Sequence, residues 1–457
     1  MSENVNKALE YASSNKKKFL DEMAELIAIP SISTDSASIP DVQRAAEWLE
    51  AKLKALNFDN VQIMPTDGLP VVYGEHLKAG KDAPTMLVYG HYDVQPADPL
   101  ELWDSEPFTA KIDGDMLFAR GSSDMKGQVI ASLAAVESIL AVGESPINIK
   151  FMLEGEEETG SPTLGEFIET NKDLFAADFA LNPDAGMLSA SQPTITYALR
   201  GLAYFQVEVS GPSHDLHSGL YGGAVRNPAN ELAKLIAGMH DENNRVTLPG
   251  FYEDVRDLDQ NERDALAKLP QDDQFYLDQT GVSALWGEEG FSSNERATGR
   301  PTLDVNGIIS GYIGEGSKTV LPASAMAKIS CRLVANQDPK KVLAQMQAYF
   351  KSNAHPSLKW EVKLLNEAVA SISELDSSEV MAMSQALQHI WGTEVLFKRE
   401  GGTIPVVGYM QDKLGIESIL TGFGLPEDRI HSPNERLNLN VWEKGIQALI
   451  HFIFNLG

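Results

Sequence analysis

The spacing of hydrophobic and polar positions divides the first 190 or so residues into alternating helices and strands. Apolar residues at helical spacing predict helices over residues 8–29, 42–56 and 126–142. Short apolar runs predict strands over residues 71–73, 85–89, 147–153 and 178–181. This alternation favours a largely parallel or mixed sheet covered by helices. In such sheets the functional residues gather where strands end, which is where the candidate residues below are found.

The pattern changes near residue 197. Strands are predicted over residues 204–209, 305–313 and 325–334, helices over 228–239 and 339–350, and an acidic, helix-prone stretch spans 253–279. The order strand–helix–strand–strand–helix–strand is typical of a small α+β domain. From about residue 400 the first pattern returns, and it ends in a predicted helix over residues 441–454.

A chain of 457 residues is too long for one ordinary core, so two domains are expected. We predict an α/β protein with a mixed-sheet domain covered by helices, formed by residues 1–196 and 400–457. An α+β domain of residues 197–399 is predicted to be inserted into it. The reason for an insertion is that His431, a candidate site residue, must rejoin candidate residues that lie before the second domain.

Composition narrows the range of partners. Hydrophobic residues make up 43% and charged residues 22%, as in soluble globular proteins. The net charge of −28 argues against nucleic acid and anionic membranes as partners, because both are polyanions. The sequence has no apolar run near the ~20 residues of a membrane span and no apolar signal segment at its start, so we expect a cytoplasmic protein. The single cysteine, Cys331, is predicted to be a buried small hydrophobe.

His91 and Asp93, in the segment GHYDV, follow the strand predicted at residues 85–89. Residues two apart on a strand point to the same face, and a histidine ligand usually has its ring oriented by a carboxylate. The pair therefore predicts a metal ligand and its support. The alternative is a loop histidine beside a surface acid.

Carboxylates also lie at the ends of two further predicted elements. Asp124, in GSSDMKG, comes directly before the helix at 126–142; it is either the N-cap of that helix or an acid whose two oxygens bridge two ions. Glu156, Glu157 and Glu158 follow the strand at 147–153 and repel each other. They form either a solvated loop or a cluster that cations stabilise, in which one acid binds metal while its neighbour activates water.

Asp184 in LNPDAG and His431 in RIHSPNE complete the candidate set, although a loop histidine is often only a surface residue. Two imidazoles and at least three carboxylates are the ligands that a pair of Zn²⁺- or Mn²⁺-like ions needs, with one carboxylate to bridge and one to act as base. Together these segments predict metal-assisted hydrolysis.

In this order, the five segments resemble the M20 metallopeptidase family over nearly the full length of the chain. The forms DLHSGLYGG, REGGTIP and EETGS are most similar to the dipeptidase branch, which includes cytosolic nonspecific dipeptidase and carnosinase. The resemblance implies a zinc-peptidase-like catalytic domain interrupted by a lid and dimerisation domain.

The resemblance also implies roles for the candidate residues. Two divalent ions, Zn²⁺ or Mn²⁺, would be held by His91 and Asp184 on one side and by Glu158 and His431 on the other, with Asp124 as the bridge. Asp93 would orient His91. Glu157 would be the general base, which takes a proton from water and passes it to the leaving amine.

The inserted domain carries further matches. His217 matches the family histidine that crosses to the active site of the partner subunit and stabilises the oxyanion, so the resemblance implies a homodimer. Arg332, Gly402 and Thr403 match residues that hold the free carboxylate of the substrate, although Arg332 could also be a surface arginine. His214 departs from the family pattern and is assigned no role.

Our preferred interpretation is a homodimeric metal-dependent dipeptidase. An M20 amidohydrolase acting on N-acyl amino acids, of the deacetylase or desuccinylase type, is the nearest alternative, because the metal motifs serve both reactions. The DLHSG loop and the long insertion favour the dipeptidase. A catalytically silent scaffold that binds metal or peptide is the second alternative, and it is disfavoured because every expected position is filled.

Overall fold

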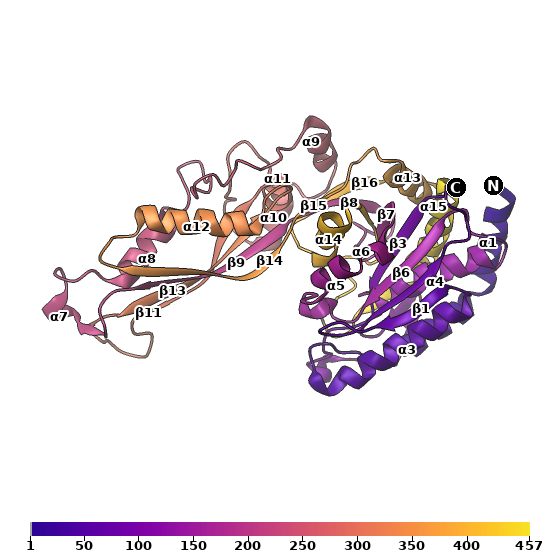
Figure 1. The fold of residues 1–457 in the computed structure, drawn as a ribbon, viewed down its shortest axis with the longest axis horizontal. Coiled ribbons are helices and arrows are strands. Elements are labelled where there is room, and N and C mark those ends of the chain that lie inside the picture. The colour runs from indigo at the N-terminus through magenta and orange to yellow at the C-terminus, as the bar shows by residue number, and fades with distance from the viewer. Residues whose placement is uncertain (1) are drawn as a thin grey trace. The chain divides into compact units, whose positions relative to one another are not determined.

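Residues 2–457, which the computed structural model describes, form two units that interrupt each other along the chain (Figure 1). The first contains the chain up to Tyr197, Ser373–Lys398 and Tyr409–Gly457, and the second contains Ala198–Ile372 and Arg399–Gly408. The predicted α/β class with two domains is confirmed. The predicted inserted segment 197–399 is too long, because helix α13 (Ser378–Trp391) packs against the C-terminal helix α15 (Leu439–Leu456) in the first unit.

The elements that lie wholly or mainly in the first unit are α1 (Ser2–Ser14), α2 (Lys16–Ile27), η1 (Ser36–Ser38), α3 (Ile39–Ala55), β1 (Asp59–Met64), β2 (Val71–His76), β3 (Thr85–His91), η2 (Leu100–Leu102), β4 (Lys111–Asp113), β5 (Met116–Phe118), α4 (Lys126–Leu140), β6 (Asn148–Glu154), η3 (Glu157–Thr159), α5 (Leu164–Thr170), α6 (Lys172–Phe175), β7 (Phe179–Asn182), β8 (Thr194–Leu199), α13, β16 (Leu396–Glu400), η4 (Met410–Leu414), β17 (Ser418–Leu420), β18 (Arg436–Asn438) and α15. The predicted helix over 8–29 is two helices, α1 and α2, which meet at Asn15.

The main sheet is mixed, with the strand order β1-β2-β6-β3-β7-β17-β8-β15 and with β16 paired to β8. Its centre, β6-β3-β7-β17, is parallel. Parallel strands are buried on both faces, and β3 and β6 are correspondingly buried along almost their whole length. The carboxyl ends of β3, β6 and β7 therefore lie at the same edge of the sheet, and each is followed by candidate residues.

Helix α4 is the central helix of the first unit. Every residue from Lys126 to Ile139 is buried, because α4 contacts strand β3 and the helices α1, α2 and α15. A helix enclosed in this way carries apolar residues around its whole circumference and not only along one stripe, and its buried Glu137 is paired with Lys18 and Lys52. At the end of the sheet formed by β1 and β2, helix α3 packs against these two strands (Figure 1).

The second unit contains a four-stranded sheet and two helices that pack on it, which follow the predicted order strand–helix–strand–strand–helix–strand, with further short elements between them. Its elements are β9 (Gly201–Ser210), β10 (Leu216–His217), α7 (Ser218–Tyr221), α8 (Pro228–Ala237), α9 (Gln260–Ala267), α10 (Asp273–Thr280), α11 (Ser293–Thr298), β11 (Thr302–Ser310), β12 (Val320–Leu321), β13 (Ser324–Leu333), α12 (Pro339–Asn353), β14 (Lys359–Ala368) and β15 (Ser371–Ile372); α14 (Pro405–Tyr409) follows in its second segment. The antiparallel sheet has the order β11-β13-β9-β14.

Alternate residues of β9 and β13 are buried, as their period-two pattern predicts. The buried face forms one core with α8 and α12, and Cys331 is fully buried in it, as expected. The helix-prone stretch 253–279 forms two short helices, α9 and α10, separated around Pro270; Asp259 and Asp272 cap their N-termini. Within residues 2–457, no helix combines the length and the apolar composition that crossing a membrane requires.

Candidate metal centre

His91 is the last residue of β3 and its side chain is fully buried. Its ring Nδ1 lies 3.1 Å from the backbone oxygen of Asp93 and 3.3 Å from the carboxylate Oδ1 of the same residue. The strand ends at His91, so the loop that follows brings Asp93 beside the ring. This contact occupies Nδ1 and leaves Nε2 to act as a ligand.

Asp124 lies between two imidazoles. Its Oδ1 is 3.1 Å from Nε2 of His91, and its Oδ2 is 2.9 Å from Nε2 of His431. The alternative role as a helix N-cap is wrong: α4 has Met125 at its N-cap position, with no side-chain capping hydrogen bond. Each oxygen of Asp124 instead faces a different candidate ligand, which is the geometry of a bridging carboxylate.

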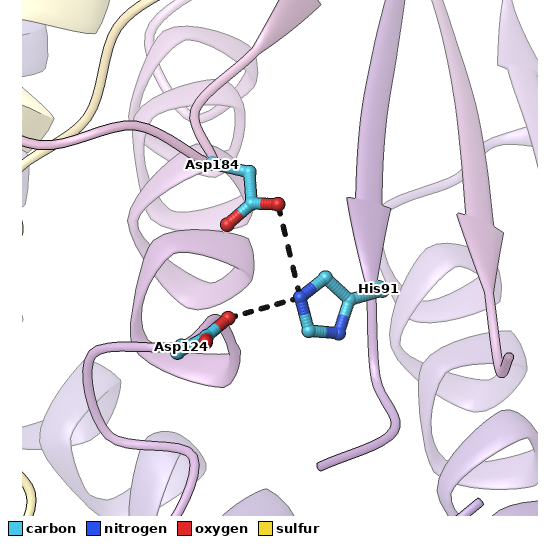
Figure 2. Close-up of side chains that lie close together, drawn as sticks. All are labelled: His91, Asp124 and Asp184. Carbon is cyan, nitrogen blue, oxygen red and sulfur yellow. Dashed lines mark hydrogen bonds and ion pairs between the residues drawn. The ribbon is translucent and has the colours of Figure 1, made fainter. Parts of the chain in front are cut away.

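Figure 2 shows the side chains of His91, Asp124 and Asp184 pointing toward one another from three separate segments. The Nε2 atom of His91 is 3.9 Å from Oδ2 of Asp184. One potential ligand atom from each of the three residues lies within 4.8 Å of the other two. This is the first ligand group.

The second ligand group consists of Asp124, Glu158 and His431, again with ligand atoms within 4.8 Å of one another. Nε2 of His431 is 3.3 Å from Oε2 of Glu158. His431 has a φ of 59°, in the left-handed region that a residue with a side chain rarely adopts, and such backbone is concentrated at functional sites. Each group offers one imidazole and two carboxylates, a donor set that suits Zn²⁺ or Mn²⁺.

The loop after β6 separates the three adjacent glutamates. The carboxylate of Asp93 accepts the backbone N–H groups of Glu157 (3.3 Å) and Glu158 (3.0 Å). Glu156 is buried and accepts hydrogen bonds from the backbone N–H groups of Leu69 and Thr163. The alternative of a solvated loop is therefore wrong for Glu156, whose carboxylate holds the loop and belongs to neither ligand group.

The pKa of the Glu157 carboxyl is raised to about 7, chiefly by burial; His91 opposes this increase, and the nearby carboxylates of Glu158 and Asp124 contribute to it. The pKa of Asp184 is also raised, chiefly by burial. Hydrogen bonds to Asp124 and Glu158 raise the pKa of His431 to about 10. These shifts share one cause: carboxylates crowd into a buried volume, where positive charge stabilises them.

A buried carboxylate that the sequence analysis missed holds the Asp124 loop. The two oxygens of Glu435 accept four N–H groups: Nη1 of Arg120 (2.7 Å) and the backbone N–H of Gly121 (3.0 Å), Ser123 (2.9 Å) and Asp124 (3.1 Å). Glu435 is the final residue of RIHSPNE, so one segment supplies His431 and also positions its partner Asp124. The motif itself was visible in the sequence, but this contact joins residues more than 300 positions apart.

We expect Glu435→Gln to lower the free energy of unfolding by about 3 kcal/mol, because it leaves the Arg120 guanidinium buried without a counter-ion. The amide would also place its own N–H₂ group against backbone donors. Urea denaturation measures the loss, with Glu427→Gln as the matched control, since Glu427 is exposed eight residues earlier in the same segment. An unfolding midpoint equal to that of the control would show that the four hydrogen bonds do not stabilise the loop.

The predicted residues of the second unit form two separate groups. Nη1 of Arg332 donates to Oγ1 of Thr403 (2.8 Å), so the segments 324–333 and 399–408 meet there, while Gly402 has open space around its Cα. His217 is exposed at the end of β10, and its ring Nδ1 accepts the backbone N–H of Gly219 (3.0 Å). His214, three residues earlier, lies 3.0 Å from the hydroxyl of Ser213 through its Nδ1.

Comparison with known proteins relates this geometry to a family. The model of peptidase family M20/M25/M40 matches residues 87–455. The Cys-Gly metallodipeptidase DUG1 of Candida albicans is 32% identical over 470 residues, which are 97% of this chain and 95% of that protein.

Two solved structures are similar to this chain over nearly its full length. The M20 family metallo-carboxypeptidase Sso-CP2 from Sulfolobus solfataricus has a TM-score of 0.82 at 33% identity, covering 96% of this chain and 99% of that one. Human carnosine dipeptidase 1 has a TM-score of 0.73 at 28% identity, covering 99% of this chain and 98% of that one. The resemblance inferred from the motifs is thereby confirmed, and this chain belongs to peptidase family M20/M25/M40.

Proposed function

We propose that this chain is a metal-dependent dipeptidase with two divalent ions, Zn²⁺ or Mn²⁺, per subunit. One observation carries the proposal: two ligand groups, His91/Asp124/Asp184 and Asp124/Glu158/His431, share Asp124. A shared carboxylate between two imidazole-containing groups fits a pair of ions better than it fits two independent ones. Two bound ions would polarise the scissile carbonyl and lower the pKa of water.

Glu157 is the proposed general base. It belongs to neither ligand group, yet it adjoins Glu158, and its backbone N–H is held by the carboxylate of Asp93. Burial raises the pKa of Glu157 to about 7. A carboxylate with a pKa near neutrality accepts a proton from the attacking water and later releases it to the leaving amine. Asp93 supports both the general base and the metal ligand His91, because its carboxylate holds the backbone N–H of Glu157 and orients the ring of His91.

His217 is the proposed donor to the oxyanion, acting in the site of the partner subunit of a homodimer. Because Nδ1 accepts the N–H of Gly219, the neutral ring carries its proton on Nε2. That nitrogen has no partner among the described residues of the chain, so it is free to donate to a developing negative charge.

We expect His217→Ala to reduce kcat about 10²- to 10³-fold, the usual effect of removing one oxyanion donor. Metal content and the mass of the dimer should stay unchanged, because His217 is exposed and forms only a local hydrogen bond. His214→Ala in the same loop is the matched control and should keep wild-type turnover. Normal turnover of His217→Ala would remove His217 from the mechanism.

The proposed substrates are free dipeptides, with their carboxylate held by Arg332, Gly402 and Thr403. Two relatives are named for dipeptide hydrolysis, the Candida Cys-Gly metallodipeptidase and human carnosine dipeptidase 1. A second candidate function is carboxypeptidase activity on longer peptides, and it is favoured by the similarity to Sso-CP2. A third is hydrolysis of N-acyl amino acids, which also places an amide next to a free carboxylate.

A substrate panel distinguishes these functions. Metal-stripped protein, restored with Mn²⁺ or Zn²⁺, is incubated with free dipeptides, the same dipeptides N-acetylated, a tripeptide and several N-acyl amino acids. Metal-restored cleavage confined to free dipeptides supports the dipeptidase. Release of the C-terminal residue from the tripeptide indicates a carboxypeptidase, cleavage of N-acyl amino acids indicates an amidohydrolase, and no cleavage of any substrate favours a silent scaffold.

A further inference from the structure

A second arginine lies beside Arg332 and Thr403 in the second unit. Arg200 lies between β8 and β9, and its Nε donates to the backbone oxygen of Gly401 (3.2 Å). The hydroxyl of Thr403 donates to the backbone oxygen of Arg200 (2.5 Å) and accepts from Nη1 of Arg332 (2.8 Å). Thr403 therefore links the two arginines, and the turn at 401–403 is held from both sides.

The fit around this turn is tight. A Cβ atom on Gly401 would come within 2.9 Å of Nη2 of Arg200 and 2.7 Å of the backbone oxygen of Ala297. Only glycine at position 401 therefore lets the guanidinium of Arg200 approach the turn this closely. The close approach shows that Arg200 is packed into the turn and does not extend into solvent.

Neither guanidinium has a directly bonded counter-ion, although the carboxylate of Asp304 lies near enough to stabilise the charge of Arg200. Within residues 2–457, no carboxylate forms an ion pair with Arg200 or Arg332, and Nη1 of Arg200 is buried without any hydrogen-bond partner. Burial, with repulsion from Arg332, lowers the pKa of Arg200 to about 10. A buried charge without a bonded partner destabilises the free protein, and Arg332, which is half-buried, places a second positive charge beside Arg200, so the pair indicates an anion that binds from outside.

We propose that the substrate carboxylate is the shared counter-ion of Arg332 and Arg200. Arg332 and the turn at 401–403 contact the carboxylate. The one proton of the Thr403 hydroxyl is donated to the backbone oxygen of Arg200, and Arg200 is a positioning residue that holds this turn and adds a second positive charge behind it. This inference rests on the proposed function and adds Arg200 to it. Two positive charges on one carboxylate make a free C-terminus a strict requirement, because a C-terminal amide would leave both guanidinium groups uncompensated.

Kinetics with a free dipeptide tests the role. Arg200→Gln retains an N–H donor for the oxygen of Gly401 but removes the charge, and we expect KM to rise about 10- to 100-fold with a smaller change in kcat. Arg200→Lys retains the charge and should recover part of the affinity. Lys363→Gln removes an exposed charge from the same unit and should match the wild type.

Thermal denaturation separates positioning from a purely structural role. Because the charge is buried and unpaired, Arg200→Gln should melt at or above the wild-type temperature without ligand. L-Alanine, which carries the carboxylate of a hydrolysis product, should raise the melting temperature of the wild type, whereas L-alaninamide should not. Arg200→Gln should lose the stabilisation by L-alanine.

The possible outcomes are distinct. A lower melting temperature of Arg200→Gln, or an unchanged KM together with full stabilisation by L-alanine, would overturn the inference. If the wild type cleaves no dipeptide, the proposed function fails, yet stabilisation by L-alanine that depends on Arg200 would still support the anion site. If dipeptides are cleaved but no carboxylate dependence on Arg200 is found, only the inference fails.

Discussion

Glu157→Gln is expected to reduce kcat by about 10²- to 10⁴-fold, the range that general acid–base catalysis contributes. The amide has nearly the same shape as the carboxyl group but cannot accept a proton from water. Glu157 is outside both ligand groups, so the variant should still bind two ions per chain. Steady-state kinetics, with metal content measured by mass spectrometry on the same preparations, gives both numbers.

The matched control is Glu166→Gln, an exposed glutamate in α5 shortly after the same loop, which should retain wild-type turnover and metal content. Retained activity in Glu157→Gln would show that another group is the base. Loss of metal together with activity would make Glu157 a ligand and would shift the roles of the adjacent glutamates by one position.

Asp124→Asn should reduce bound metal from two ions per chain to less than one and reduce kcat by at least the same factor as Glu157→Gln. The two oxygens of Asp124 face Nε2 of His91 and Nε2 of His431, so its charge serves both ligand groups. Asparagine preserves the size of the side chain but removes the negative charge that two neighbouring cations require.

Calorimetric titration of metal-stripped protein with Mn²⁺ measures the stoichiometry. Asp113→Asn, which changes an exposed aspartate on β4, is the control and should bind as the wild type does. If Asp124→Asn binds two ions with wild-type affinity, Asp124 is not the bridge. A helix-capping role would predict only a loss of stability with unchanged metal binding, and the structure already lacks the capping hydrogen bond.

The local hydrophobic pattern was sufficient to predict those features that depend on a single helix or strand. The strands β3, β6 and β7 are apolar because parallel strands are buried on both faces, so they could be recognised from short apolar runs, and His91, Glu157, Glu158 and Asp184 follow directly from their ends. The alternating burial of β9 and β13 is the corresponding feature of the second unit, where only one face of the sheet is buried. The hydrophobic period and the order of the strands along the chain are properties of the sequence itself, whereas their order in the sheet is not.

Boundaries and turns were predicted less well, because they depend on neighbours. The sequence pattern predicted that the chain returns to the first unit near residue 400. In the structure it returns at Ser373, because α13 already packs against α15. A long amphipathic segment at the N-terminus was expected to be one helix, but it divides at Asn15. Helical spacing alone does not show where a chain bends to follow the surface of its own core.

The sequence by itself determined the class of fold, the family and the set of residues able to bind metal. Only the tertiary structure decided that Asp124 faces two histidines and is not a helix cap, that Glu435 holds the Asp124 loop, and that Arg200 shares the turn of Thr403. Each of these contacts joins segments far apart in the chain. Periodicity records which side of an element is buried, whereas which distant polar group meets another is settled only when the buried surfaces pack together.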